Sequence, residues 1–196
     1  MIAQGKLTGV SFPDDPSGGD LSKVLATRIL DVPDFPNPGV VFKDITPLLA
    51  DPEAFAVVVG AMAELVRAAG ATRVAGLEAR GFILAAPVAL AAGVGFVPVR
   101  KAGKLPRETY HEDYQLEYGT AAIEVHRDAF QPGERVMVVD DILATGGTAV
   151  AAANLVRDAG AEPVGLAVLM ELAFLHGRER FAAAVPNAGI HPLLVV

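Results

Sequence analysis

The segment VMVVDDILATGGTAV, residues 136–150, is the one that decides the fold. It begins as an uninterrupted apolar run, passes through two adjacent carboxylates, Asp140 and Asp141, and ends in the glycine-rich ATGGT before an alanine-rich stretch. The apolar run predicts a strand buried on both faces, and the stretch after Gly147 predicts a helix. A strand followed by a tight turn and a helix is the unit of a parallel, helix-covered sheet.

The same alternation continues on both sides of this segment. Before it, residues 73–79 (RVAGLEA) predict a strand, residues 80–93 a helix and residues 95–100 another strand. After it, residues 163–172 (PVGLAVLMEL) predict one more strand. Strands that alternate with helices imply right-handed crossover connections. The predicted fold class is therefore α/β, with a mostly parallel central sheet flanked by helices.

The N-terminal quarter has a different pattern. Residues 21–30 have helical spacing of apolar side chains, and the prolines of residues 31–49 predict a rigid, irregular segment. A capping Asp51 with Pro52 predicts the start of a helix, which should end near Gly70. Much further along, the polar stretch AGKLPRETYHEDYQLEYGT is too long for an ordinary connection and predicts a functional loop, such as a lid.

Composition limits the classes of function. The chain has 196 residues, 52 % of them hydrophobic, which suits one domain with a sizeable core; we expect it over residues 21–196, after a disordered tail at residues 1–20. The net charge of −7 argues against a nucleic-acid partner. The absence of cysteine excludes disulfides, thiolate metal sites and cysteine nucleophiles. Since the first residues do not resemble a secretory signal, we expect a cytoplasmic protein.

One apolar stretch is long enough to be considered as a membrane span. Residues 82–99 run without a charge and are long enough to reach the lower limit for a spanning helix. Two prolines and two glycines interrupt them, and alanine contributes little to insertion. We therefore expect a buried helix to about Ala92 and a strand from about Val94, and no membrane partner.

The two carboxylates and the glycine turn predict a binding site at the carboxyl end of a strand, where open α/β sheets bind ligands. Amides and the dipole at a helix start attract an anion, and Thr145 and Thr148 can add hydroxyl donors. A phosphate carried by a sugar explains Asp140 and Asp141 as well, because carboxylates accept hydrogen bonds from vicinal hydroxyls and a nearby Mg²⁺ offsets their charge. Spacing alone also allows a plain strand-to-helix turn with incidental acids.

Several stretches of the sequence resemble those of one known family. VMVVDDILATGGTA resembles the phosphoribosyl-pyrophosphate signature of the type I phosphoribosyltransferases. FPNPGVVFKDITPLL resembles the base-recognition segment of their adenine-specific members, EARGF the pyrophosphate loop, and RKAGKLP with LEYGT the lid. These stretches follow the family's order and cover about residues 21–180. The resemblance implies the type I phosphoribosyltransferase fold, with a small N-terminal hood at residues 21–50, a flexible lid hairpin at residues 101–120, and a homodimer.

The resemblance also assigns residues to the parts of the substrates. Those for the ribose and its phosphate are Asp140, Asp141, Ala144, Thr145, Gly146, Gly147 and Thr148, and the two carboxylates would also hold Mg²⁺ through water. Those for pyrophosphate are Glu78, Ala79, Arg80, Arg100, Lys101 and Lys104, with the Glu78–Ala79 peptide bond in the cis form. Those for adenine are Val41, Phe42, Lys43 and Ile142, with Phe42 and Ile142 on opposite faces of the ring.

The implied reaction joins adenine to phosphoribosyl pyrophosphate and yields AMP and pyrophosphate. Arg80 and Glu117 are the implied catalytic residues: Arg80 clamps pyrophosphate oxygens, and Glu117 lies near N7 of the base. Considered without the family, Glu117 could be a surface acid, Phe42 a core residue and the basic stretch 99–107 a solvated hairpin.

Two other functions are compatible with the signature. One is a phosphoribosyltransferase for a 6-oxopurine, against which the proline-rich base segment argues. The other is a non-catalytic regulator that binds phosphoribosyl pyrophosphate, against which the acidic net charge and the lack of a helix-turn-helix pattern argue.

Overall fold

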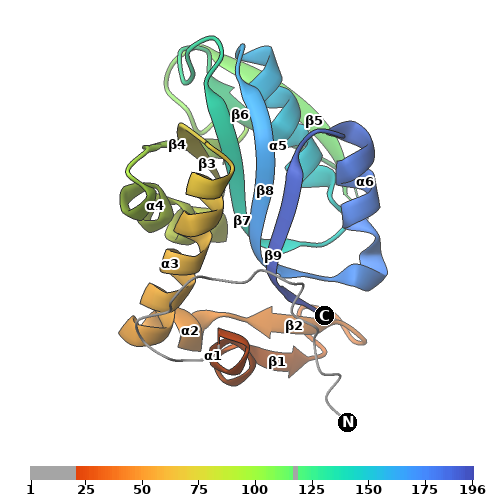
Figure 1. Ribbon diagram of the computed structural model, residues 1–196. Coiled ribbons are helices and arrows are strands. Elements are labelled where there is room, and N and C mark those ends of the chain that lie inside the picture. The colour runs from red at the N-terminus through yellow and green to blue at the C-terminus, as the bar shows by residue number, and fades with distance from the viewer. Residues whose placement is uncertain (1–20, 117–118) are drawn as a thin grey trace. The chain divides into compact units, whose positions relative to one another are not determined.

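The computed structural model describes residues 21–116 and 119–196 (Figure 1). The described residues fall into two compact units, a smaller one that ends at Ala61 and a larger one that begins at Met62. The boundary lies inside a long helix, α3 (Pro52–Ala68), which contributes residues to both units. A single domain over residues 21–196 stays a prediction.

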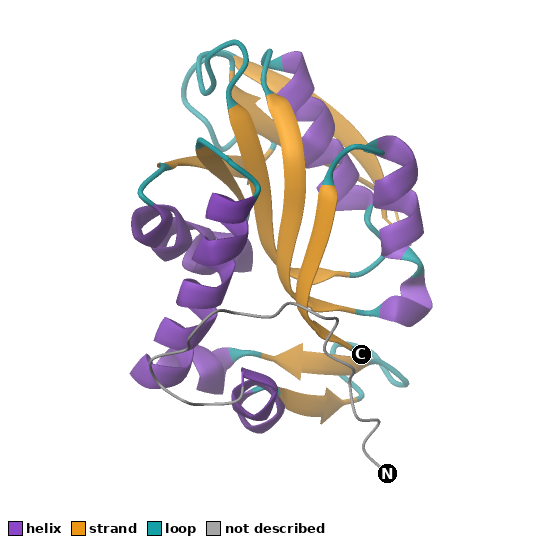
Figure 2. Cartoon of the chain, viewed as in Figure 1, coloured by secondary structure: helices purple, strands orange, loops and turns teal. Residues whose placement is uncertain are grey.

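The larger unit is built on a sheet in which seven strands are described (Figure 2). The spatial order is β5-β6-β4-β3-β7-β8-β9. The strands are β3 (Arg73–Leu77), β4 (Gly95–Lys101), β5 (Thr109–Leu116), β6 (Gly119–His126), β7 (Arg135–Leu143), β8 (Glu162–Glu171) and β9 (Gly189–Val195). In the part of the sheet with the order β4-β3-β7-β8-β9, neighbouring strands run parallel. On the other side of β4, β6 and β5 extend the sheet antiparallel.

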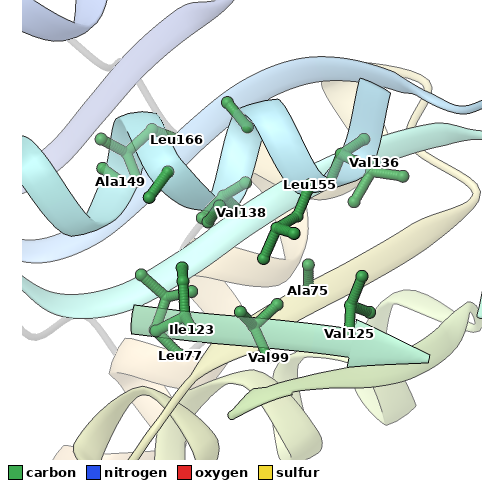
Figure 3. Packing of buried hydrophobic residues seen from close by; sticks show 14 of the residues in the cluster. Ala75, Leu77, Val99, Ile123, Val125, Val136, Val138, Ala149, Leu155 and Leu166 are labelled. Atoms are coloured by element: carbon green, nitrogen blue, oxygen red, sulfur yellow. The ribbon is translucent and has the colours of Figure 1, made fainter. Parts of the chain in front are cut away.

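Helices cover both faces of the parallel strands, which is why those strands are apolar without alternation. α4 (Arg80–Ala92) packs on one face, and α5 (Gly147–Asp158) and α6 (Gly177–Ala184) lie on the other (Figure 1). In the core beneath α5, Leu155 of α5, Val138 of β7 and Leu166 of β8 belong to one buried hydrophobic cluster (Figure 3). The predicted α/β fold with a mostly parallel, helix-flanked sheet is confirmed.

The smaller unit contains α1 (Leu21–Arg28), β1 (Leu30–Pro33), β2 (Val41–Asp44), α2 (Thr46–Ala50) and the first part of α3. The prediction that residues 31–49 are irregular is wrong in part, because β1 and β2 pair antiparallel, with Val32 opposite Phe42. The prolines do not prevent this pairing, since Pro36 lies in the connecting turn and Pro33 ends a strand that is itself an edge.

The predicted start of α3 is confirmed. Asp51 Oδ1 accepts hydrogen bonds from the backbone N–H groups of Glu53 and Ala54, both at 3.1 Å. The helix ends at Ala68, and Gly70 follows with a left-handed φ of +60°, a conformation that glycine adopts easily. A capping aspartate, a first-turn proline and a closing glycine therefore fix both ends of this helix.

The polar stretch of residues 102–120 is only partly a loop. Residues from Thr109 onward form β5, which pairs with β6 over its whole length. Tyr110 and Tyr114 pack on the core while His111 and Asp113 face solvent, so the strand alternates because only one of its faces is buried. The polar residues of this outer face explain why the sequence reads as a loop.

The apolar run of residues 82–99 forms most of α4 and the start of β4, as predicted. Within the described ranges, no helix has the length and apolar character that a membrane span requires.

Candidate functional site

The starts of two helices lie at the same edge of the central sheet. β3 and β7 are parallel neighbours, so their carboxyl ends meet there; α4 follows β3, and α5 follows β7. In the part of the chain that the structure describes, no side chain caps either helix, and neither helix has an acidic residue in its first turn. Their backbone N–H groups and positive dipole ends therefore remain available for anions.

Asp140 and Asp141 lie at the end of β7, next to the start of α4. Asp141 is only 3 % exposed, and Asp140 is partly buried. The Asp141 N–H donates to Asp140 Oδ1 at 2.9 Å. Arg80 Nη2 lies 2.9 Å from Asp141 Oδ2 and forms an ion pair with it. The geometry is not that of a hydrogen bond, and Oδ2 accepts none from the described residues.

Ionisation of the two carboxyl groups is unfavourable in this environment. Burial raises the pKa of both, and raises it strongly for Asp140, where the negative charge of Asp141 adds to the effect. For Asp141 the Arg80 guanidinium opposes this effect without cancelling it. A site of this kind favours a cation or hydroxyl donors next to the carboxylates.

Gly81 lets α4 approach these carboxylates closely. A Cβ on Gly81 would lie 2.8 Å from Asp140 Oδ1 and 2.9 Å from the Val139 carbonyl oxygen. Both distances are shorter than real Cβ contacts, so the first turn of α4 can pack on the end of β7 only through a glycine.

The connection between β7 and α5 is the predicted glycine turn, residues 144–148. Gly146 has a left-handed φ of +79° and precedes the first helical residue, Gly147, which is buried. The Val150 N–H donates to the Gly146 carbonyl at 3.0 Å, so the helix begins directly after the turn. Ala144, Thr145 and Thr148 are partly buried. The turn therefore has the form of an anion cradle; its binding of phosphate stays a proposal.

The residues predicted for pyrophosphate come together at the ends of β3 and β4. The Glu78–Ala79 peptide bond is cis, as the resemblance implied. Glu78 Oε2 accepts hydrogen bonds from Arg100 Nε at 3.3 Å and from the Lys101 N–H at 3.0 Å, and Arg100 Nη1 donates to the Lys104 carbonyl at 3.0 Å. Because its carboxylate is directed to these groups, Glu78 arranges the cations.

Glu124 of β6, which our sequence reasoning missed, supports the same basic segment. It is 5 % exposed, and its Oε1 accepts hydrogen bonds from the N–H groups of Lys104 at 2.9 Å and Leu105 at 2.8 Å. Burial alone would raise its pKa, but amide hydrogen bonds from Leu105, Gly103 and Lys104 outweigh it and leave the pKa lowered. The available signal was a single acid inside the otherwise apolar run AAIEV.

Three of the four residues predicted for adenine lie on β2 in the smaller unit. Val41 is exposed, the Phe42 ring meets Phe35 edge-on at 5.2 Å between centroids, and Lys43 Nζ lies 2.6 Å from Asp31 Oδ1. Ile142 belongs to β7 of the larger unit, where it is partly buried. The remaining predicted residue, Glu117, lies outside the described residues.

The carboxylates at the end of β7 fit Mg²⁺. The described residues contain no group of three or more candidate metal ligands from His, Asp or Glu. Mg²⁺, however, is usually held by one or two carboxylates together with water and substrate phosphates. Asp140 and Asp141 provide this pair of hard oxygen donors, and Asp141 Oδ2 is buried without a hydrogen bond from the described chain.

Known proteins resemble this chain over most of its length. A family model for the phosphoribosyl transferase domain matches residues 44–181. The adenine phosphoribosyltransferase of Streptomyces coelicolor is 61 % identical over 182 residues, which are 93 % of this chain and 99 % of that protein. A crystal structure of adenine phosphoribosyltransferase from Rhodothermus marinus has a TM-score of 0.82 and 49 % identity, covering 89 % of this chain and 97 % of its own.

A further solved relative carries ligands. The adenine phosphoribosyltransferase of Saccharomyces cerevisiae, complexed with D-2,5-dideoxy-2,5-imino-altritol 1,6-bisphosphate and adenine, has a TM-score of 0.82 and 39 % identity. The match covers 89 % of this chain and 98 % of that one. The likeness thus extends over nearly the full length of the proteins compared.

Proposed function

The chain belongs to the adenine phosphoribosyltransferase family, and from this premise we propose that it transfers the 5-phosphoribosyl group of phosphoribosyl pyrophosphate to adenine. The products are AMP and pyrophosphate, as purine salvage requires. The observation that carries the proposal is the meeting of two helix starts without side-chain caps in the described chain, α4 and α5, beside the buried Asp141 and the partly buried Asp140. Such an edge suits a ligand that has a phosphate at each end and hydroxyls between them.

In this proposal the substrate spans the edge of the sheet. The ribose phosphate binds the amides and hydroxyls of residues 144–148 at the start of α5. Asp140 and Asp141 accept hydrogen bonds from the ribose hydroxyls. The pyrophosphate end binds the backbone after β3, with Arg80, Arg100, Lys101 and Lys104 around it.

The chemical step moves charge onto the leaving group. A ring nitrogen of adenine bonds to carbon 1 of ribose, the bond from that carbon to pyrophosphate breaks, and its electron pair leaves with pyrophosphate. The side chains of Arg80, Arg100, Lys101 and Lys104 stabilise this developing negative charge. Glu117 holds or relays the proton of the base near N7. Closure of residues 101–120 keeps water from the reactive ribose carbon.

Mg²⁺, held through water by Asp140 and Asp141, would supply additional positive charge to the oxygens of the substrate. The chemistry of the donor pair supports this requirement. Removing divalent cations with EDTA should therefore abolish AMP formation, and added Mg²⁺ should restore it. Full activity in EDTA would remove the metal from the proposal.

Adenine is recognised in this proposal by backbone groups of β2. Carbonyl and N–H groups around Val41 and Lys43 match the amino donor and the ring acceptor at the edge of adenine. Phe42 and Ile142 pack on the two faces of the ring. The Lys43 side chain pairs with Asp31, which supports a role for its backbone in reading the base. We also propose that the protein works in the cytoplasm as a homodimer.

A base-competition assay tests the proposed function. With Mg²⁺ and phosphoribosyl pyrophosphate present, nucleotide formation is followed from adenine, hypoxanthine, guanine and xanthine. We expect AMP from adenine and no product from the other bases. Turnover of a 6-oxopurine would overturn the assignment of the base and keep the chemistry. Tight substrate binding without turnover of any base would favour the non-catalytic regulator.

A further inference from the structure

The phosphate loop, residues 144–148, packs directly against the first residue of α6. A Cβ on Gly177 would lie 2.1 Å from the Ala144 carbonyl oxygen and 2.9 Å from the Gly146 nitrogen. In the other direction, a Cβ on Gly146 would lie 2.7 Å from the Gly177 carbonyl oxygen. All three distances are shorter than real Cβ contacts, so any side chain at position 177 must displace the backbone of the loop.

Position 177 requires glycine because there is no room for a side chain. Gly146 has a left-handed φ, which by itself favours glycine, whereas Gly177 does not have a positive φ. An alanine at 177 could therefore adopt the local backbone conformation, and its methyl group would still collide with the loop. For this reason Gly177→Ala reports on the contact between α6 and the loop, without a conformational strain of its own.

An ion pair holds this start of α6 in place. Arg178 donates from Nε to Glu171 Oε1 at 2.9 Å and from Nη2 to Oε2 at 2.5 Å, which is a bidentate contact. Glu171 is 4 % exposed at the end of β8, where its backbone lies opposite Leu143, the residue before the loop. The Leu172 N–H also donates to the Leu143 carbonyl at 2.9 Å. The same strand end thus fixes the entrance of the loop and the position of α6.

We propose that Gly177 is a positioning residue for the ribose phosphate, held in place by the Glu171–Arg178 pair. By filling the space against Ala144 and Gly146 with backbone alone, it keeps the loop in the shape that directs its N–H groups to the phosphate. The inference rests on the proposed function and adds a residue that lies outside the signature. Neither Gly177 nor the ion pair needs to touch the substrate for this role.

Binding of two partial ligands to the full chain tests the inference. Ribose 5-phosphate probes the loop, and pyrophosphate probes the segments after β3 and β4; calorimetry gives both dissociation constants. In Gly177→Ala we expect the affinity for ribose 5-phosphate to fall by at least about tenfold, because a displaced loop misplaces its donors. The affinity for pyrophosphate should change by less than about twofold, since the residues proposed to bind it lie at the ends of β3 and β4 and not in the loop that Gly177 contacts.

Gly60→Ala is the matched control. Gly60 is a helical residue of α3, and a Cβ there meets nothing within 4 Å, so this variant should bind both ligands as the wild type does. Arg178→Lys is the second variant, for use if Gly177→Ala does not fold. It keeps the positive charge and loses the bidentate contact, and it should weaken ribose 5-phosphate binding selectively.

Several outcomes would overturn the inference. One is an equal loss of affinity for both ligands, which would indicate general damage to the protein. Another is unchanged ribose 5-phosphate binding in Gly177→Ala. If Gly177→Ala does not fold, unchanged ribose 5-phosphate binding in Arg178→Lys has the same meaning. A wild-type protein that binds neither ligand would contradict the inference and the proposed function together. A wild type that binds both and forms no AMP would contradict only the proposed function, because selective loss could still be measured.

Discussion

At the scale of single residues, Asp140 and Asp141 oppose the stability of the fold that contains them. Burial raises their pKa above the usual 3.8. A carboxyl with a raised pKa in the folded state stabilises the fold below its unfolded pKa, and this contribution is lost as the pH rises through the folded pKa. At neutral pH the buried pair is therefore destabilising.

Replacing Asp140 by Asn should separate stability from binding. At pH 7 we expect Asp140→Asn to raise Tm, by about 2–4 °C for each kcal/mol of repulsion removed. The gain should shrink as the pH falls through the raised folded pKa of Asp140, and it should be gone below about pH 4, where the carboxyl is protonated in the unfolded chain as well. The affinity for phosphoribosyl pyrophosphate should fall at the same time. Calorimetric melting at both pH values, with titration of the substrate, checks this; a lower Tm at pH 7 would refute it.

Glu124 affects stability in the opposite direction, because its ionised form stabilises the fold. Its pKa lies below the usual 4.5, so its contribution to stability is present above that value and is lost as the pH falls through the lowered folded pKa. In Glu124→Gln the amide oxygen can still accept from the Lys104 and Leu105 N–H groups, but the negative charge that strengthens these hydrogen bonds is lost. An NH₂ group also replaces Oε2, which accepts from Thr109 Oγ1 at 3.4 Å. We expect a lower Tm at pH 7, a smaller loss of Tm on acidification, and weaker pyrophosphate binding.

The exposed Glu108 provides the control for this substitution. Glu108→Gln removes the same charge close to the same segment, without a buried carboxylate being lost. It should leave Tm and pyrophosphate affinity near those of the wild type. If both variants behaved alike, loss of charge would explain the effect, and the role of Glu124 in holding residues 103–105 would fail.

At the scale of elements, the proposed lid is testable by hydrogen exchange. Residues 102–108 join β4 to β5, which is an edge strand of the described sheet. We expect phosphoribosyl pyrophosphate to increase amide protection across residues 101–116, because closure brings Lys101 and Lys104 onto the substrate. Amides of residues 136–139, the part of the central strand β7 that precedes the two aspartates, should stay equally protected in both states. Equal protection of the lid with and without substrate would contradict closure.

The elements also show which kinds of structure the sequence reveals. β7 and α5 are predicted well because a long apolar run and an alanine-rich helical period have few other interpretations. β1 and β2 are missed because each is short and the segment between Val32 and Val41 is rich in proline. β5 is missed because its outer face is polar, which makes an edge strand resemble a loop.

Some residues of the candidate site are also predictable from the sequence, and others are not. Asp140, Asp141 and the glycine turn occur together in one segment, so local pattern is enough to find them. Gly177 and Glu124 act on segments far from them in sequence, and their neighbours become visible only when α6 and β6 are packed. No period or spacing rule connects such pairs: the lone acid in AAIEV marks Glu124 as unusual, but nothing in the sequence identifies its partners.

At the scale of the whole molecule, an apolar surface on α4 supports the proposed homodimer. Leu90 is 83 % exposed, and Ile83 is exposed two turns earlier on the same side of the helix. Phe96 of β4 is also exposed and meets Phe82 of α4 edge-on. Neighbouring exposed apolar side chains of this kind are typical of a protein interface.

Light scattering tests this interface. The wild type should have twice the 20.3 kDa mass of one chain, and Leu90→Glu should have the mass of one chain, because burying an unpaired carboxylate is unfavourable. Phe174→Glu is the control, since Phe174 is also an exposed apolar side chain, 67 % open to solvent, on a different element, η1 (Ala173–Leu175). A wild type with the mass of one chain would exclude the dimer.

The buried carboxylate pair also has a consequence for laboratory evolution. A library of variants selected only for survival on heating, in the absence of substrate, should accumulate neutral residues at positions 140 and 141. The winners of such a selection would be heat-resistant proteins with little affinity for phosphoribosyl pyrophosphate. Heating the same library with Mg²⁺ and phosphoribosyl pyrophosphate present should retain both aspartates, because a ligand that binds only the folded state stabilises the variants that can hold it.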